Sequence, residues 1–348
     1  MSYYILINLK KTLKTDIINV GLMIASVALA ILLPFELFLL SYAVLGPLHY
    51  ATEISWLQKK QYFVTRKIDW MALVIVCSVI TILMILVSYW PNFKDSRWVE
   101  SFLNSQSLDK QTFGDELSLW PACLIFLALT SAFILTFVKD WFWRINSFAA
   151  AIFCVLLFKG TPNYTIFFGI LLTTIIHVWL FTGIFMLSGA IKAKNISSYL
   201  SFAAFLGCSA SFIFISRENY AISNKALEIV SNSGFGLALN QAILQMFSIP
   251  FEKADLLSSS TALKVQSFIA FAYTYHYLNW FSKVEVIKWN KVSKKALMIS
   301  AVIWGVSLVL YAYDFRVGAS FLLFLSLLHV FLEFPLNFHA AAIVLNRK

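Results

Sequence analysis

Four histidines stand out because each lies deep inside a different apolar segment. His49, His177, His276 and His329 are each about 12 to 13 residues from the same side of a membrane-length helix, or roughly 18 to 20 Å below that surface. Ionisable side chains inside a bilayer are costly, and they generally face the protein interior or a wet cavity. Four such residues at one depth therefore predict a single site.

Two of these histidines are followed by a glutamate on the same helix face. His49 and Glu53 have the spacing i, i+4, as do His329 and Glu333, so each imidazole lies one turn from a carboxylate. Imidazole nitrogens mixed with carboxylate oxygens suit iron, manganese or zinc, in a mononuclear or a dinuclear centre. We expect non-haem iron, with zinc and manganese as alternatives. The predicted metal ligands are His49, Glu53, His177, His276, His329 and Glu333.

Neighbouring polar and aromatic residues are placed to assist such a site. Asn279 and Lys283 follow His276 at helical spacing and continue a polar stripe toward the end of the segment. We expect five residues to orient the ligands or to contact a substrate: Asn279, Tyr273, Asn337, His339 and Lys283.

The same histidines and glutamates fit other functions. As weaker alternatives to a metal site, they suit a relay that passes protons or a metal ion in a transporter, or hydrogen bonds that only hold helices together. A transporter is expected to show internal symmetry between its halves, and the sequence shows none. Bis-histidine ligation of one haem b would leave two of the four histidines without a role.

The composition defines the class of protein. Of the 348 residues, 60% are hydrophobic and only 13% are charged, and Phe occurs 33 times. This much apolar surface predicts an all-α, polytopic membrane protein. The net charge of +10 comes from short basic clusters between apolar runs, which is typical of topology signals and not of a nucleic-acid-binding face.

Apolar runs of membrane-spanning length number about ten. We place them near 17–33, 36–57, 70–90, 119–138, 145–159, 165–190, 197–215, 264–282, 296–313 and 317–345. With both termini in the cytoplasm, the basic clusters of the connecting loops fall on the cytoplasmic side, as the positive-inside rule requires. The clusters are Lys59, Lys60, Arg66 and Lys67; Lys139 and Arg144; Lys192 and Lys194; Lys283 to Lys295; and Arg347 and Lys348.

Segment 234–250 is apolar but is interrupted by Asn240, Gln241 and Gln245 and ends at Pro250. A full span there would place the Lys283 to Lys295 cluster outside, so we predict a re-entrant or interfacial helix. No loop is long enough to bury a core of its own, and residues 1–348 are therefore expected to form a single transmembrane domain.

One short motif resembles a known family. The stretch GPLHYATE, residues 46–53, is similar to the GxxHxxxD motif of the Brp/Blh family of membrane β-carotene dioxygenases, with Glu53 where that family has Asp. The resemblance implies a histidine-bound iron and oxygen-dependent cleavage of a polyene, and it can be carried over only to His49 and Glu53.

These observations predict a metal-dependent oxygenase or other oxidoreductase in a bacterial-type inner membrane. Its substrate would be lipophilic, such as a lipid or a polyene reached through the bilayer, and its partners would be membrane lipids and an unidentified redox partner, not nucleic acid. The alternative is a proton- or metal-ion-coupled transporter or binding protein that uses the same histidine and glutamate cluster.

Overall fold

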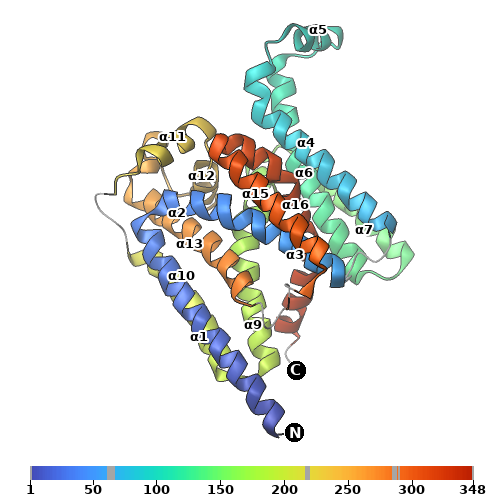
Figure 1. The fold of residues 1–348 in the computed structure, drawn as a ribbon. Coiled ribbons are helices and arrows are strands. Elements are labelled where there is room, and N and C mark those ends of the chain that lie inside the picture. Colours follow the sequence, from blue (N-terminus) through green and yellow to red (C-terminus); the bar gives the residue numbers. More distant parts are fainter. Residues whose placement is uncertain (1, 61–66, 216–219, 284–287, 289–290, 347–348) are drawn as a thin grey trace.

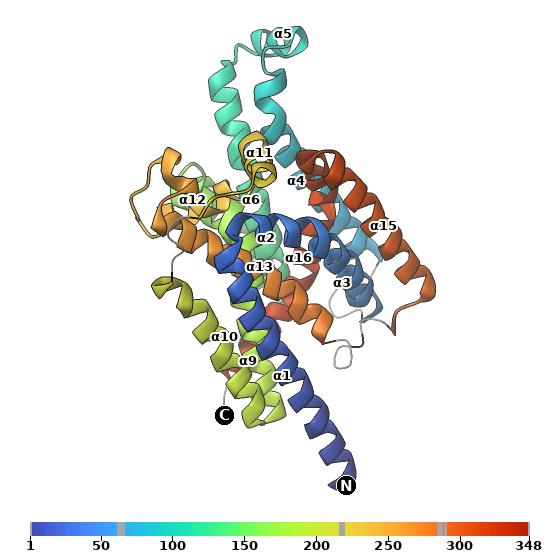
Figure 2. The same ribbon diagram turned by 60° about the vertical axis from the view of Figure 1, so that its left-hand side comes forward.

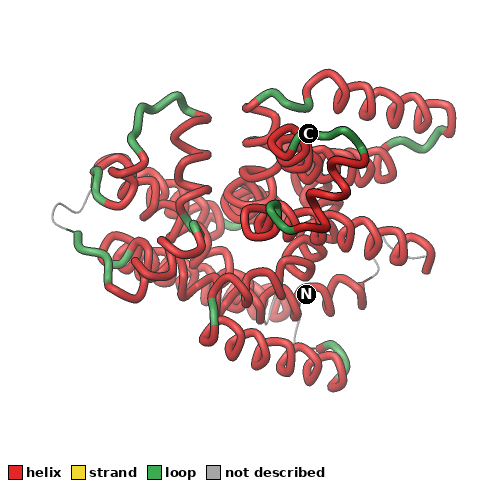
Figure 3. The backbone as a smooth tube through the Cα atoms, turned by 90° about the horizontal axis from the view of Figure 1, so that it is seen from above, coloured by secondary structure: helices red, strands yellow, loops and turns green. Residues whose placement is uncertain are grey.

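The computed structural model describes residues 2–60, 67–215, 220–283, 288 and 291–346. Within that part every regular element is a helix, which confirms the predicted all-α class (Figures 1 and 3). The first half contains α1 Ser2–Leu32, α2 Pro34–Leu40, the π-helix η1 Ser41–Leu45, α3 Gly46–Lys60, α4 Lys67–Phe93, α5 Arg97–Ser105, α6 Lys110–Phe137 and α7 Trp141–Phe158.

The second half begins with the short α8 and a long π-helical stretch. Its elements are α8 Pro162–Tyr164, the π-helix η2 Thr165–Phe181, α9 Thr182–Ala193, α10 Ile196–Phe214, α11 Asn224–Ser233, α12 Leu237–Met246, the 3₁₀-helix η3 Lys253–Leu257, α13 Ser260–Ser282, α15 Lys294–Tyr313 and α16 Phe315–Leu345.

Eight helices of the described part are long and apolar enough to cross a membrane, so the chain is a polytopic membrane protein. They are Thr12–Leu32, Met71–Phe93, Lys110–Phe137, Trp141–Phe158, Pro162–Ala193, Ile196–Phe214, Lys294–Tyr313 and Phe315–Leu345. Each overlaps one of the ten predicted spans. The two remaining predictions, 36–57 and 264–282, form the run from α2 through α3 and the helix α13, which are not among these eight. The number ten therefore stays a prediction.

Helix α13 lies at the centre of the bundle, packed against α1, α2, η1, η2, α10 and α12. Helix α16 is the second inner helix and packs against α3, α4, α6, α9 and α15. The hairpin of α4 and α6 extends away from the bundle and carries α5 at its tip, whereas both termini lie at the opposite end of the molecule (Figures 1 and 2). The inner helices α13 and α16 are the ones that carry three of the predicted ligands.

The predicted short helix in 234–250 is present as α12. It packs between η2 and α13, and the fully buried Asn240 donates a hydrogen bond of 2.9 Å to the Ala262 carbonyl. Its depth in the membrane stays a prediction. The orientation of the whole chain stays one as well, because the side chains of Lys60, Arg66, Lys67, Arg347 and Lys348 lie outside the described residues.

Helix α3 begins with a proline that alters the helix before it. Pro47 has no N–H to donate to the carbonyl of Ala43, and the π-helical turn η1, Ser41–Leu45, ends directly before the Gly46-Pro47 pair. Gly46 keeps helical dihedral angles, φ −54° and ψ −56°, although a Cβ in that conformation would crowd the following proline ring. His49 follows this junction directly, in the first turn of α3.

Candidate metal centre

The six predicted ligands converge from four elements. Helix α3 supplies His49 and Glu53, η2 supplies His177, α13 supplies His276, and α16 supplies His329 and Glu333. All six side chains are buried, with exposed fractions between 1% and 7%. The sequence placed them together only by depth, and the structure brings all six into one cluster in the interior of the described bundle.

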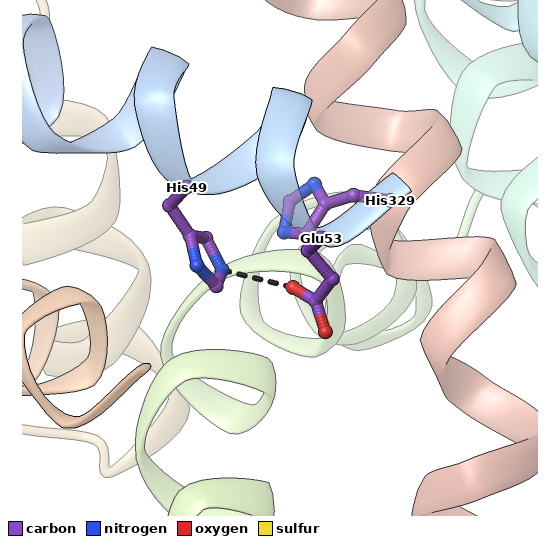
Figure 4. A group of neighbouring side chains, drawn as sticks. All are labelled: His49, Glu53 and His329. Atoms are coloured by element: carbon purple, nitrogen blue, oxygen red, sulfur yellow. Dashed lines mark ion pairs between the residues drawn. The ribbon is translucent and has the colours of Figure 1, made fainter. Parts of the chain in front are cut away.

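The imidazole nitrogens and carboxylate oxygens are close enough to share an ion. The Nε2 atoms of His49 and His276 are 3.1 Å apart, and His49 Nε2 is 3.1 Å from Glu53 Oε2. One ligand atom each from His49, Glu53 and His329 lie within 4.8 Å of one another (Figure 4).

The second carboxylate has its own histidine. Glu333 Oε2 lies 3.3 Å from His177 Nε2. The His177 ring is 5.3 Å from the ring of His276 and 5.2 Å from that of His329, measured between centroids. The cluster is therefore continuous, with one carboxylate beside His49 and the other beside His177.

Thr182, at the start of α9, determines which nitrogen of the His276 ring carries the proton. Its hydroxyl donates to the Val178 carbonyl at 2.8 Å, and its oxygen lies 2.9 Å from His276 Nδ1. Because the hydroxyl has one proton, we infer that Thr182 accepts a hydrogen bond from Nδ1–H. The Nε2 atom of His276 then carries a lone pair directed into the cluster, which is the form of imidazole that binds a metal.

Several polar atoms of the cluster lack hydrogen bonds. Among the described residues no partner with hydrogen-bond geometry meets either nitrogen of His177, Glu53 Oε2 or Glu333 Oε2. Each unsatisfied buried polar group costs free energy of about 1–3 kcal/mol, and more if it is charged. A cation would satisfy these atoms together. The mixed nitrogen and oxygen donors fit iron, zinc or manganese, so the residues present are suited to the predicted metal.

A cavity of about 610 Å³ reaches this cluster. His49, Glu53, His276 and Glu333 line its inner end, and residues of α1, α9, α10, α13 and α16 line most of the remainder. This volume is within the range of small-molecule sites. The cavity gives a ligand a route to two of the four histidines and to both glutamates.

The five predicted supporting residues divide between different surroundings. Asn279, Lys283 and His339 line the cavity. Tyr273 does not, since its ring packs edge to face on Phe38 at 5.1 Å. Asn337 is fully buried, and neither of its amide atoms has a hydrogen-bond partner among the described residues.

Sequence reasoning missed the groups that orient the ligands. The ring of Tyr50 stacks on His329 at 4.3 Å, and the hydroxyls of Tyr50 and Tyr277 are 2.8 Å apart. No pattern distinguishes these tyrosines or Thr182 from the many aromatic and hydroxyl residues of the other helices. The available signal was adjacency in the sequence, since Tyr50 directly follows His49 and Tyr277 directly follows His276.

Comparison with known proteins gives no match: no family model, no curated protein and no solved structure is similar to the chain.

Proposed function

We propose that the chain is an integral-membrane oxidoreductase with a non-haem metal centre, most simply an iron oxygenase acting on a lipophilic substrate. The observation that supports this proposal is the meeting of six buried nitrogen and oxygen ligands, several of them without hydrogen bonds, at the inner end of a cavity. The resemblance of residues 46–53 to the Brp/Blh motif agrees with it at His49 and Glu53.

The roles of the residues follow from their positions. The four histidines and two glutamates would hold the metal, and Thr182 would keep His276 in the binding form. A bound iron supplies the electrons that activate oxygen. The surrounding rings of Tyr50, Tyr277 and Trp280 exclude water from the centre and restrict access to the cavity side. A bacterial-type inner membrane is the proposed location.

The first test is the metal content of the detergent-purified protein, measured by elemental analysis together with an absorption spectrum. We expect about one or two irons per chain and no haem Soret band. His276→Ala should lose most of the metal, whereas His339→Ala should keep it, because His339 is an exposed cavity residue outside the cluster. A wild-type chain without metal, or full metal in His276→Ala, would overturn the proposal.

A second candidate is a transporter for protons or a metal ion. The observation in its favour is the polar lining of the cavity, which includes Asp16, Lys192 and Lys283 on the way to the cluster. Uptake of Fe²⁺, Zn²⁺ or protons into proteoliposomes that stops in Glu333→Gln would support transport. A metal that stays bound through repeated washing, with no ion flux, would favour the enzyme.

A further inference from the structure

The cavity has two walls of different chemistry. Helices α9 and α16 present more apolar and small residues than polar ones to it, among them Met186, Ala190, Leu336 and Ile343. The polar residues on these two helices are Thr182, Ser188, Lys192, Glu333 and His339. Helices α1, α10 and α13 present hydroxyl, amide and charged groups. A space with one apolar wall and one polar wall is suited to an amphiphilic molecule.

The polar wall is rigid where α1 meets α13. The buried Asn19 accepts hydrogen bonds from Tyr275 at 3.3 Å and from Ser282 at 3.0 Å, and donates to the Thr15 carbonyl at 2.9 Å. Because its amide oxygen and one amide N–H are used inside the protein, Asn19 helps to position the wall.

A lysine on this wall is left for a ligand. Lys283 lines the cavity, and among the described residues its ammonium group forms no hydrogen bond or close ion pair. The negative charge of Asp16 acts on Lys283, but Asp16 Oδ2 already accepts hydrogen bonds from Ser197 at 2.6 Å and Ser198 at 2.9 Å. The exposed Lys192 adds a second positive charge to the lining.

The distance between this charge and the metal ligands sets the size of the ligand. Lys283 follows His276 by two helical turns on the same side of α13, which places it about 10 Å farther along the helix axis. Over a similar length the apolar wall extends from Glu333 to Ile343 on α16, about 15 Å. A chain lying along this wall would reach the cluster at one end and Lys283 at the other.

We propose that the cavity binds a long-chain amphiphile with an anionic head group, held at Lys283, with its chain directed toward His276 and Glu333. This inference rests on the proposed function, since the metal centre makes the inner end of the chain the reactive end. It narrows the substrate class from lipophilic molecules in general to chains that carry a carboxylate or a similar anion.

The test uses a spin-labelled long-chain carboxylic acid and the matched alcohol, whose immobilised fraction is measured by EPR on the purified full-length protein. The wild type should bind the acid more tightly than the alcohol. Lys283→Met should weaken binding of the acid about tenfold and leave the alcohol unchanged. Lys225→Met is the matched control, because Lys225 is exposed on α11 and pairs with Glu228.

A second pair of variants tests the location of the site. A Cβ added at Gly189, which lines the cavity, or at Gly207, which does not, would meet nothing within 4 Å. Thermal unfolding of both Phe variants checks that each one folds, and only Gly189→Phe should abolish binding of the acid and the alcohol. Unchanged binding in Gly189→Phe would overturn the cavity as the site.

Metal content measured on the same samples separates this inference from the proposed function. Equal binding of acid and alcohol to the wild type, or no effect of Lys283→Met, would overturn the anionic head group even if the metal is present. A chain that binds the acid as expected but contains no metal would support the binding site and overturn the proposed oxygenase.

Discussion

The candidate metal centre has two unlike sides. On one side lies an aromatic cluster, defined as Phe38, Tyr42, Tyr50, Phe235, Tyr273 and Tyr277, whose ring centroids are 4.6 to 6.1 Å apart. On the other side lies the cavity, with hydroxyls, amides and lysines in its wall. Both sides touch His49: Tyr277 at 5.2 Å between ring centroids, and the cavity directly.

The aromatic cluster and the cavity have different roles at the centre. The aromatic cluster holds the ligand rings in place by packing, since aromatic pairs prefer defined edge-to-face and offset geometries. The cavity leaves His276 and Glu333 accessible to a molecule from outside the centre. Substitutions on the aromatic side should therefore change stability, and those on the cavity side should change binding.

The largest expected effect is a difference between two Phe→Ala substitutions. Phe38 is 2% exposed within the aromatic cluster, so Phe38→Ala should leave a void and destabilise the fold by about 3–5 kcal/mol. Phe185 lines the cavity, and Phe185→Ala would only enlarge an existing space, at a cost of roughly 1 kcal/mol or less. Unfolding of the two purified variants and of the wild type measures both losses of stability. Equal costs would mean that the two sides are packed alike.

The same contrast explains how much of the fold the sequence could predict. Eight of the ten expected spans coincide with strongly apolar helices, because a helix that faces lipid must be apolar nearly throughout. Helix α13 instead buries Gln266, His276 and Asn279 against other helices. A helix surrounded by protein can carry polar groups, so hydropathy is a weaker guide to the elements that form the site.

The sequence could predict only those site residues whose side chains cost much free energy to bury in a membrane. Histidine and glutamate in apolar segments must find partners, which allowed six side chains to be grouped before their contacts were known. Their role as metal ligands stays a prediction. Burying a tyrosine or threonine hydroxyl costs less than burying a charge, and Thr182 satisfies its hydroxyl on its own helix, so these residues give no comparable signal. The π-helical stretch that presents His177 has no clear sequence signature either.

An intermediate effect is expected from one hydroxyl on the cavity side. Thr182→Val removes the hydrogen bond to His276 Nδ1 with little change in volume, and should weaken metal binding about 10- to 100-fold. Thr136→Val on α6 is the control, because Thr136 also donates to the carbonyl four residues earlier, at 2.6 Å. Competition with a chromophoric chelator measures both affinities. If the two variants lose affinity equally, Thr182 does not position His276.

The smallest expected effect is on the free energy of unfolding of two Gly→Ala variants, one of which should be destabilised and the other stabilised. A Cβ at Gly46 would lie 3.1 Å from the Tyr50 hydroxyl and 3.2 Å from that of Tyr277. These hydroxyls are buried and paired, and Pro47 disfavours a Cβ in the helical conformation of Gly46, so Gly46→Ala should destabilise the protein by about 1 kcal/mol.

Gly189→Ala should do the opposite. Its Cβ would meet nothing within 4 Å, and alanine is favoured over glycine inside a helix, so we expect about 0.5–1 kcal/mol of stabilisation. Thermal unfolding of both variants under the same detergent conditions tests the pair. A stabilising Gly46→Ala would show that Tyr50 and Tyr277 can move apart. Because the ring of Tyr50 stacks directly on that of His329, the aromatic cluster could then not be the rigid support of His49 and His329.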